Sequence, residues 1–218
     1  MNLDSIIEKT ERYVREKLEE EASGHDWWHI KRVYNNALLI ASEEKECDLV
    51  VVKLAALLHD IADWKFNHGD ELAGYNAAKE WLRSLGAEEG LIEHVAEIVK
   101  DISFKGAGEK TPMKTLEGEI VQDADRLDAM GAIGIARAFA YGGNRNREMY
   151  NPEVKPVLHE NFEEYKKSKG TTINHFYEKL LLLKDLMNTE AGRKYAEGRH
   201  EYMEGFLKEF YGEWNGEV

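Results

Sequence analysis

Apolar residues recur along most of the chain at the three- and four-residue spacing of an α-helix, not in the alternation of a strand. The first predicted helix, over residues 2–21, places Ile6, Val14 and Leu18 roughly on one side. A second helix is predicted over about residues 25–42. The segment from 49 to about 61 is apolar almost all round, which is typical of a buried central helix.

The same periodicity continues to the C-terminus. Further helices are predicted at about 70–85, 88–103, 115–122, 127–139, 153–168, 173–187 and 190–212. The chain has only 3 prolines, which also favours helix. The sequence therefore predicts an all-α protein. Gly142-Gly143 is expected to open a polar loop at 142–151, so we predict a core over 1–141 and a C-terminal helical lobe over 142–218, packed as one continuous domain.

Charge narrows the function classes. The formal net charge of −13 argues against binding to a nucleic-acid duplex or to an anionic membrane surface. The single cysteine, Cys47, excludes an intrachain disulfide and a multi-cysteine metal site. With no signal peptide and no apolar run long enough for a membrane span, we expect a cytoplasmic protein. An anionic substrate would need a local source of positive charge, such as a metal ion.

The apolar run of the third helix ends in His59-Asp60. A carboxylate at the end of a buried helix is costly unless it is paired or bound to an ion. The alternative is a His–Asp pair that simply caps the helix end.

A second segment carries His25 and His29, which share a helix face because they are four residues apart. Taken alone, either one is more often a hydrogen-bonded core histidine than a ligand.

A third segment, residues 120–128, places Asp123, Asp125 and Asp128 beside a stretch of small residues at 131–136. Small residues allow close helix approach, so these acids need partners. Asp123 is alternatively an N-cap for a helix that begins near Asp125. Together the three segments supply imidazole and carboxylate groups, a mixed set suited to a divalent cation.

The order His29, His59-Asp60, Asp125 resembles the H…HD…D signature of the HD-domain metal-dependent phosphohydrolases. The flanks also match: His-x-x-Arg-Val at 29–33, Ala-Ala-Leu-Leu-His-Asp at 55–60 and Ala-Asp-Arg-Leu at 124–127. The stretch from Asn174 to His200 looks like the tail of the small bacterial stand-alone members.

This resemblance implies an HD-domain helical bundle with a C-terminal helical extension. It also implies that His29, His59, Asp60 and Asp125 bind one divalent metal ion, with Mn, Fe, Mg, Zn and Ni left open. Asp125 is preferred over Asp123 because Ala-Asp-Arg-Leu is the form found in the family. Asp123 and His25 are then supporting residues or caps.

Asp63 follows His59 by one helical turn and is our candidate for orienting or deprotonating water, although a capping or solvated Asp is an equal alternative. The tetraphosphate-hydrolysing branch of the family has HDxxED here. Trp64 replaces its second acid, which weakens that assignment.

Phosphate binding requires cations, and Lys65 is the first choice as a catalytic cation. The other candidates share a positive or potentially positive side chain: Arg32, Arg126, Arg145, Arg147, His175 and Lys179. For any one of them, an ordinary surface charge is the alternative. His94 is interpreted as a helix-face histidine, and residues 106–111 as a surface loop and not a P-loop.

The resemblance implies attack by a metal-bound hydroxide on a nucleotide or another small phosphoester. Pyrophosphohydrolysis of nucleoside triphosphates is the leading prediction. Nucleotide phosphomonoesterase or phosphodiesterase activity is the first alternative, and a non-catalytic metal or nucleotide sensor is the second. A homodimer is left open.

Overall fold

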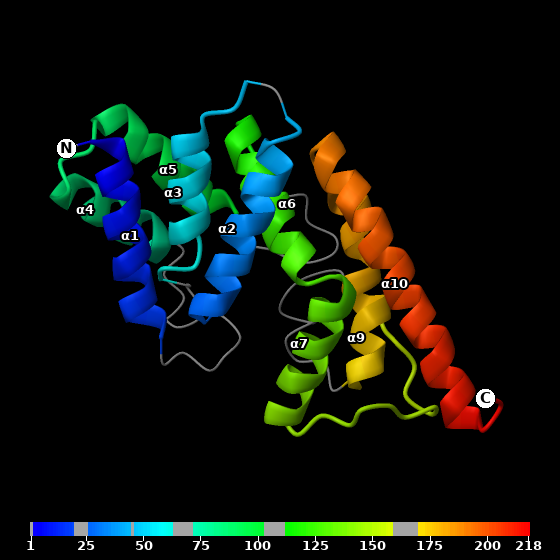
Figure 1. Ribbon diagram of the computed structural model, residues 1–218. Helices are drawn as coiled ribbons and strands as arrows, with labels where there is room; N and C mark the ends of the chain where they lie inside the picture. The colour runs from blue at the N-terminus through cyan, green and yellow to red at the C-terminus, as the bar shows by residue number, and fades with distance from the viewer. Residues whose placement is uncertain (1, 20–25, 45, 63–71, 103–111, 159–169) are drawn as a thin grey trace. The chain divides into compact units, whose positions relative to one another are not determined.

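The computed structural model describes residues 2–19, 26–44, 46–62, 72–102, 112–158 and 170–218 of the chain. Every regular element among these residues is a helix, which confirms the all-α prediction. The elements, shown in Figure 1, are α1 (Leu3–Leu18), α2 (Trp27–Ala41), α3 (Leu49–Leu58), α4 (Ala73–Ser84), α5 (Glu89–Asp101), α6 (Leu116–Asp128), α7 (Gly131–Asn144), α9 (Thr172–Glu178), the 3-10 helix η1 (Leu180–Leu186) and α10 (Glu190–Asn215).

The chain forms two compact units. The described residues up to Asp125 make the N-terminal unit, and those from Arg126 onward make the C-terminal unit. The sequence predicts a domain boundary further along, at 141–142, and that boundary stays a prediction. No helix within the described ranges is both long enough and apolar enough to cross a membrane.

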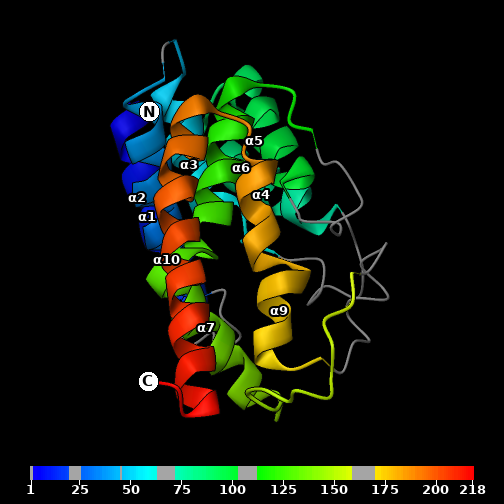
Figure 2. The same cartoon turned by 90° about the vertical axis from the view of Figure 1, so that its right-hand side faces the viewer.

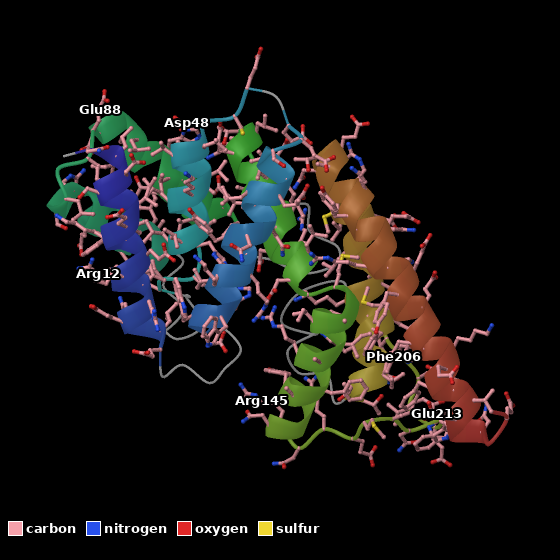
Figure 3. The ribbon with its side chains drawn as sticks, in the orientation of Figure 1. Arg12, Asp48, Glu88, Arg145, Phe206 and Glu213 are labelled. Atoms are coloured by element: carbon pink, nitrogen blue, oxygen red, sulfur yellow. The ribbon has the colours of Figure 1, made fainter. Side chains whose placement is uncertain are left out.

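Helix α3 is the centre of the N-terminal unit. Its start is fixed by Asp48, labelled in Figure 3, whose carboxylate accepts the N–H groups of Val50 and Val51 at 2.8 and 3.3 Å. Every residue from Leu54 to Leu58 is fully buried. The helix packs against α1, α2 and α5, as Figure 1 shows. The all-round apolar pattern of this segment therefore predicts its central position correctly.

The C-terminal unit packs the long helix α10 against α7 and η1, and Figure 2 shows α10 running beside these elements and α9. Aromatic side chains fill the space between them. Phe206 of α10, labelled in Figure 3, stacks on Phe176 of α9 with ring centroids 5.7 Å apart. Its edge meets Phe139 of α7 at 5.9 Å.

Several predicted boundaries are wrong for identifiable reasons. Helix α3 ends at Leu58 and not near residue 61, because the chain turns at His59. The separate helices predicted at 115–122 and 127–139 are divided differently: α6 is continuous to Asp128, and the break falls at Ala129–Met130. Gly131, with a φ of 66°, allows the chain to turn there.

The loop predicted to start at Gly142-Gly143 begins later, because α7 continues to Asn144. Gly142 is tolerated inside this helix for a packing reason. A Cβ at this position would lie 2.2 Å from Oγ1 of Thr172 on α9, so only glycine permits the approach of the two helices.

Two predicted C-terminal helices also differ. Residues 153–158 are not helical, in keeping with Pro156, which cannot donate within a helix; the rest of the predicted 153–168 helix lies outside the described residues. The helix predicted over 173–187 divides at Lys179 into α9 and η1.

Candidate metal centre

His29 is held at the start of α2. Asp26 is the N-cap residue, and its Oδ1 accepts the backbone N–H of His29 at 2.8 Å. The His29 side chain is almost completely buried, and the adjacent Trp27 is buried while Trp28 is 62% exposed. The cap therefore fixes the backbone of a histidine that points away from solvent. His25 lies outside the described residues.

His59 and Asp60 follow the last residue of α3. The N–H of Ile61 bonds to the carbonyl of Leu58 at 3.1 Å, an i to i−3 bond that tightens the chain into a turn at this point. Nδ1 of His59 lies 2.9 Å from the carbonyl oxygen of Ala56, which requires the proton to be on Nδ1. That tautomer leaves the lone pair of Nε2 available for a metal ion.

Asp125 comes from the last turn of α6. Its Oδ1 lies 3.5 Å from Nε2 of His29 and 3.9 Å from Nε2 of His59. Oδ2 of Asp60 lies 3.3 and 3.6 Å from the same two nitrogen atoms. The two nitrogen atoms are themselves 3.2 Å apart. Three helical elements thus bring four donor atoms to one place in the N-terminal unit.

These separations fit a single cation. Bonds of about 2.1 Å place neighbouring donors about 3.0 Å apart at a right angle and about 3.4 Å apart at the tetrahedral angle. The five separations of 3.2 to 3.9 Å are close to this. The ligand atoms of His29, His59 and Asp125 all lie within 4.8 Å of one another, whereas Asp60 lies within 3.6 Å of both imidazoles but falls outside this three-residue group. Two imidazole nitrogens and two carboxylate oxygens form a donor set that Mn²⁺, Fe²⁺, Ni²⁺ and Zn²⁺ accept.

The candidate centre is buried on one side and open on the other. The side chains of both histidines are 2% exposed, and that of Asp60 is 15% exposed. The side chain of Asp125 is 38% exposed. The carboxylate of Asp125 is thus the most exposed of the four side chains, whereas both imidazoles lie within the core.

The other acids and the extra histidine have different surroundings. Asp123 lies inside α6 with no exposed surface, so its interpretation as a helix N-cap is wrong. Asp128 is also buried and accepts a hydrogen bond from Nη1 of Arg137 at 2.6 Å. His94 lies on α5, as expected, with Nε2 3.1 Å from Oγ1 of Thr115.

The predicted phosphate-binding residues fall in different parts of the chain. Arg32 lies in α2, one turn after His29, and is partly buried. Asp63 and Lys65, the candidate catalytic residues, lie outside the described residues. Arg126, the first residue of the C-terminal unit, donates from Nη1 to the backbone carbonyl of Leu186.

The remaining four candidates lie in the C-terminal unit. The guanidinium carbons of Arg145 and Arg147 lie 5.4 and 5.8 Å from the ring centroid of Tyr141. Burial lowers the pKa of His175 on α9, and the positive charges of Lys179 and Arg147 lower it further, to about 3.

Asp26 has a positioning role at this centre that the sequence analysis did not identify. The signal was present, since an Asp three residues before His29 at the start of an apolar-periodic segment is a typical N-cap. A cap acts on the backbone, so the pattern alone does not connect Asp26 with the imidazole of His29.

Comparison with known proteins shows the family to which the chain belongs. Residues 27–130 match the family described as HD domain, a range that includes all four donor residues. The chain is 37% identical to the Bacillus subtilis protein YpgQ over 204 residues, which covers 93% of this chain and 90% of that protein.

Solved structures are also similar over nearly the whole chain. A crystal structure of an HD-superfamily hydrolase from Bacillus thuringiensis is 44% identical, with a TM-score of 0.77 and coverage of 98% of this chain and 99% of that chain. A crystal structure of B. subtilis YpgQ in complex with ADP is 33% identical, with a TM-score of 0.74 and coverage of 95% and 97%.

Proposed function

The chain belongs to the HD domain family, and we propose that it is a divalent-metal-dependent phosphohydrolase that acts on nucleotides. The observation that carries the proposal is the convergence of His29, His59, Asp60 and Asp125 in the N-terminal unit. Our specific proposal is hydrolysis of a nucleoside triphosphate between the α and β phosphates, to give the monophosphate and pyrophosphate.

The four residues would hold one divalent ion. When bound, such an ion supplies Lewis-acid chemistry, because it polarises phosphoryl oxygens and lowers the pKa of water. Hydrogen bonds within the protein orient the histidine donors for metal binding. Ala56 fixes the tautomer of His59, and Asp26 fixes the start of the helix that carries His29.

The charge of the metal centre indicates that side chains must also neutralise the substrate phosphates. Two carboxylates offset the two positive charges of the ion, and the imidazoles of His29 and His59 are neutral as ligands, so the loaded centre has no formal excess of positive charge. A triphosphate therefore needs cationic side chains. Arg32 is suited to this, because residues three apart on a helix are neighbours and Arg32 follows His29 by three.

The other proposed phosphate contacts are Lys65, Arg126, Arg145, Arg147, His175 and Lys179. His175 can act only as a neutral hydrogen-bonding group near pH 7, since its pKa is lowered to about 3. Asp63 is proposed to orient or deprotonate the attacking water.

The choice of a nucleotide is supported by a relative. YpgQ, which covers most of this chain, was crystallised in complex with ADP. ADP carries the α and β phosphates that the triphosphate substrate proposed here also carries.

The decisive experiment is turnover of a nucleotide panel with Mn²⁺ or Mg²⁺ in water enriched in ¹⁸O, with products separated and weighed by mass spectrometry. The proposal expects one monophosphate and one pyrophosphate for each triphosphate. The position of the label reports the atom attacked: label in the monophosphate means attack at the α phosphorus, and label in pyrophosphate means attack at the β phosphorus.

Two variants make the result specific. Asp60→Asn keeps the side-chain shape but removes a charged donor, and it should abolish turnover. His94→Gln changes a histidine of the same unit that pairs with Thr115, and it should leave turnover intact. Orthophosphate released from a monophosphate would replace the proposal with a phosphatase. No metal-dependent turnover of any nucleotide would overturn it, in favour of a sensor or of another phosphoester substrate.

A further inference from the structure

A side-chain amide links two of the helices that carry the candidate ligands. Nδ2 of Asn36 on α2 donates to the backbone carbonyl of Ala124 on α6 at 3.3 Å. The two residues are 88 positions apart in the chain. Ala124 is fully buried, and Asn36 is partly buried between the buried residues Val33 and Ala37.

Both residues of this hydrogen bond are related to the candidate centre. Asn36 follows His29 by seven residues, which is two helical turns, so both side chains leave the same face of α2. Ala124 immediately precedes Asp125. The amide therefore joins the helix of one donor to the peptide unit beside another donor, within the N-terminal unit.

A hydrogen bond constrains these helices differently from apolar packing. Apolar side chains resist separation of two helices but give little preference to one register along the axis. A donor that must lie about 3 Å from one particular carbonyl oxygen does favour one register. Metal ligands need such control, because a site misplaced by about 0.5 Å loses its productive geometry.

We propose that Asn36 is a positioning residue that sets the register of α2 against α6, and with it the 3.5 Å separation of His29 Nε2 and Asp125 Oδ1. This inference rests on the proposed metal site. It assigns to Asn36 no contact with metal or substrate.

The test measures metal binding and not turnover. Mn²⁺ affinity of the full chain is determined by calorimetry, and the absorption spectrum of the Co²⁺-substituted protein reports ligand geometry. Asn36→Leu should weaken Mn²⁺ binding about tenfold, which is about 1.4 kcal/mol, and should change the Co²⁺ spectrum. Asn36→Ala is the second variant, in case leucine does not fit, and the same two changes are expected.

The matched control removes a similar link elsewhere in the same unit. Nε1 of Trp81 on α4 donates to Oγ1 of Thr10 on α1 at 2.9 Å, and neither helix carries a candidate ligand. Thr10→Val should lower the thermal stability of the metal-free protein about as much as Asn36→Leu does. It should leave Mn²⁺ affinity within twofold of the wild type and the Co²⁺ spectrum unchanged.

His29→Ala separates failure of this inference from failure of the metal site. If His29→Ala loses Mn²⁺ binding while both Asn36 variants bind as the wild type does, the positioning role is wrong and the site stands. Equal weakening by Thr10→Val would also overturn the role, since the effect would then be general destabilisation. If His29→Ala binds Mn²⁺ normally, the metal site itself is wrong, and the positioning role falls with it.

Discussion

The imidazole Nε2 atoms of His29 and His59 face each other at 3.2 Å, although the two residues come from different helical elements. The rings meet edge to face, with an interplanar angle of 67°. Because Nδ1 of His59 points to the carbonyl of Ala56, its Nε2 presents a lone pair to this space. A cation held between His29, His59 and the neighbouring carboxylates would satisfy this lone pair.

Metal removal should therefore destabilise the protein. An ion that binds only the native state at 100 times its Kd adds about 2.7 kcal/mol. For a chain of this size that corresponds to about 5 to 10 °C in Tm. Differential scanning calorimetry with chelator and then with added Mn²⁺ measures the difference.

The matched variants are His59→Ala and His94→Gln. The first should melt at the same temperature with and without Mn²⁺, and the second should keep the full Mn²⁺-dependent increase. A wild-type Tm that does not respond to Mn²⁺ would contradict binding at this centre.

The stability of the metal-free protein should fall in mild acid because of His175. Burial and the nearby Lys179 and Arg147 lower the pKa of this group from 6.5 to about 3 in the native state. Between these values the unfolded chain takes up a proton that the native state does not, so stability rises with pH there. Above the unfolded value His175 is neutral in both states and contributes no slope.

From pH 7.5 to pH 5.0, His175 should lower the free energy of unfolding by up to about 2 kcal/mol, at about 1.4 kcal/mol per pH unit below 6.5. Urea titrations in chelator at the two pH values measure this against His175→Gln, which keeps a polar side chain but does not titrate. The other titratable groups contribute equally to the pH dependence of the wild type and of His175→Gln. Equal losses in the two would show that His175 is not the group responsible.

The elements that the sequence predicts best are those whose signal is local. The apolar run of Leu49–Leu58 and its Asp48 cap are sufficient to indicate a buried helix, and α3 is one. The continuity of α6 was missed because its helix-disfavouring Asp123 was interpreted as a cap. In the structure Asp123 is fully buried in the helix interior, where tertiary packing overrides propensity.

The candidate centre could be predicted only in part. The order of His29, His59-Asp60 and Asp125 suggested common ligands through resemblance, whereas helix geometry makes adjacent side chains diverge. The tight turn at His59 is what allows both neighbours to face one point. Contacts such as that of Asn36 with Ala124 join residues 88 apart, and no local pattern reports them.

Removal of Arg137, the partly exposed partner of the buried carboxylate of Asp128, should destabilise the protein. Nη1 of Arg137 lies 2.6 Å from Oδ2 of Asp128, whose side chain is only 2% exposed. Arg137→Met removes this hydrogen bond to a buried carboxylate but leaves the nearby cation Arg199, so we expect a cost of about 1–3 kcal/mol. Urea unfolding at pH 7 measures the loss.

Two further variants test the explanation. The exposed pair of Arg83 and Glu89 is the control, and Arg83→Met should change stability far less than Arg137→Met does, because solvent screens an exposed pair. Adding Asp128→Leu to Arg137→Met removes the buried carboxylate and should recover part of the lost stability. Failure of the double variant to recover any would mean that packing, and not the buried charge, is responsible.

Gly134 should not tolerate even a methyl group. A Cβ there would lie 2.3 Å from the carbonyl oxygen of Ala129, a backbone atom in the turn between α6 and α7 that cannot rotate away as a side chain can. The turn itself must move, so Gly134→Ala should destabilise by about 2–3 kcal/mol. Gly198 of α10 is the control, because nothing lies within 4 Å of the position of its Cβ. Gly198→Ala should stabilise the helix by up to about 1 kcal/mol, since alanine is the better helix former. Both effects are measured by urea unfolding, and a neutral or stabilising Gly134→Ala would show that the α6–α7 turn adjusts without cost.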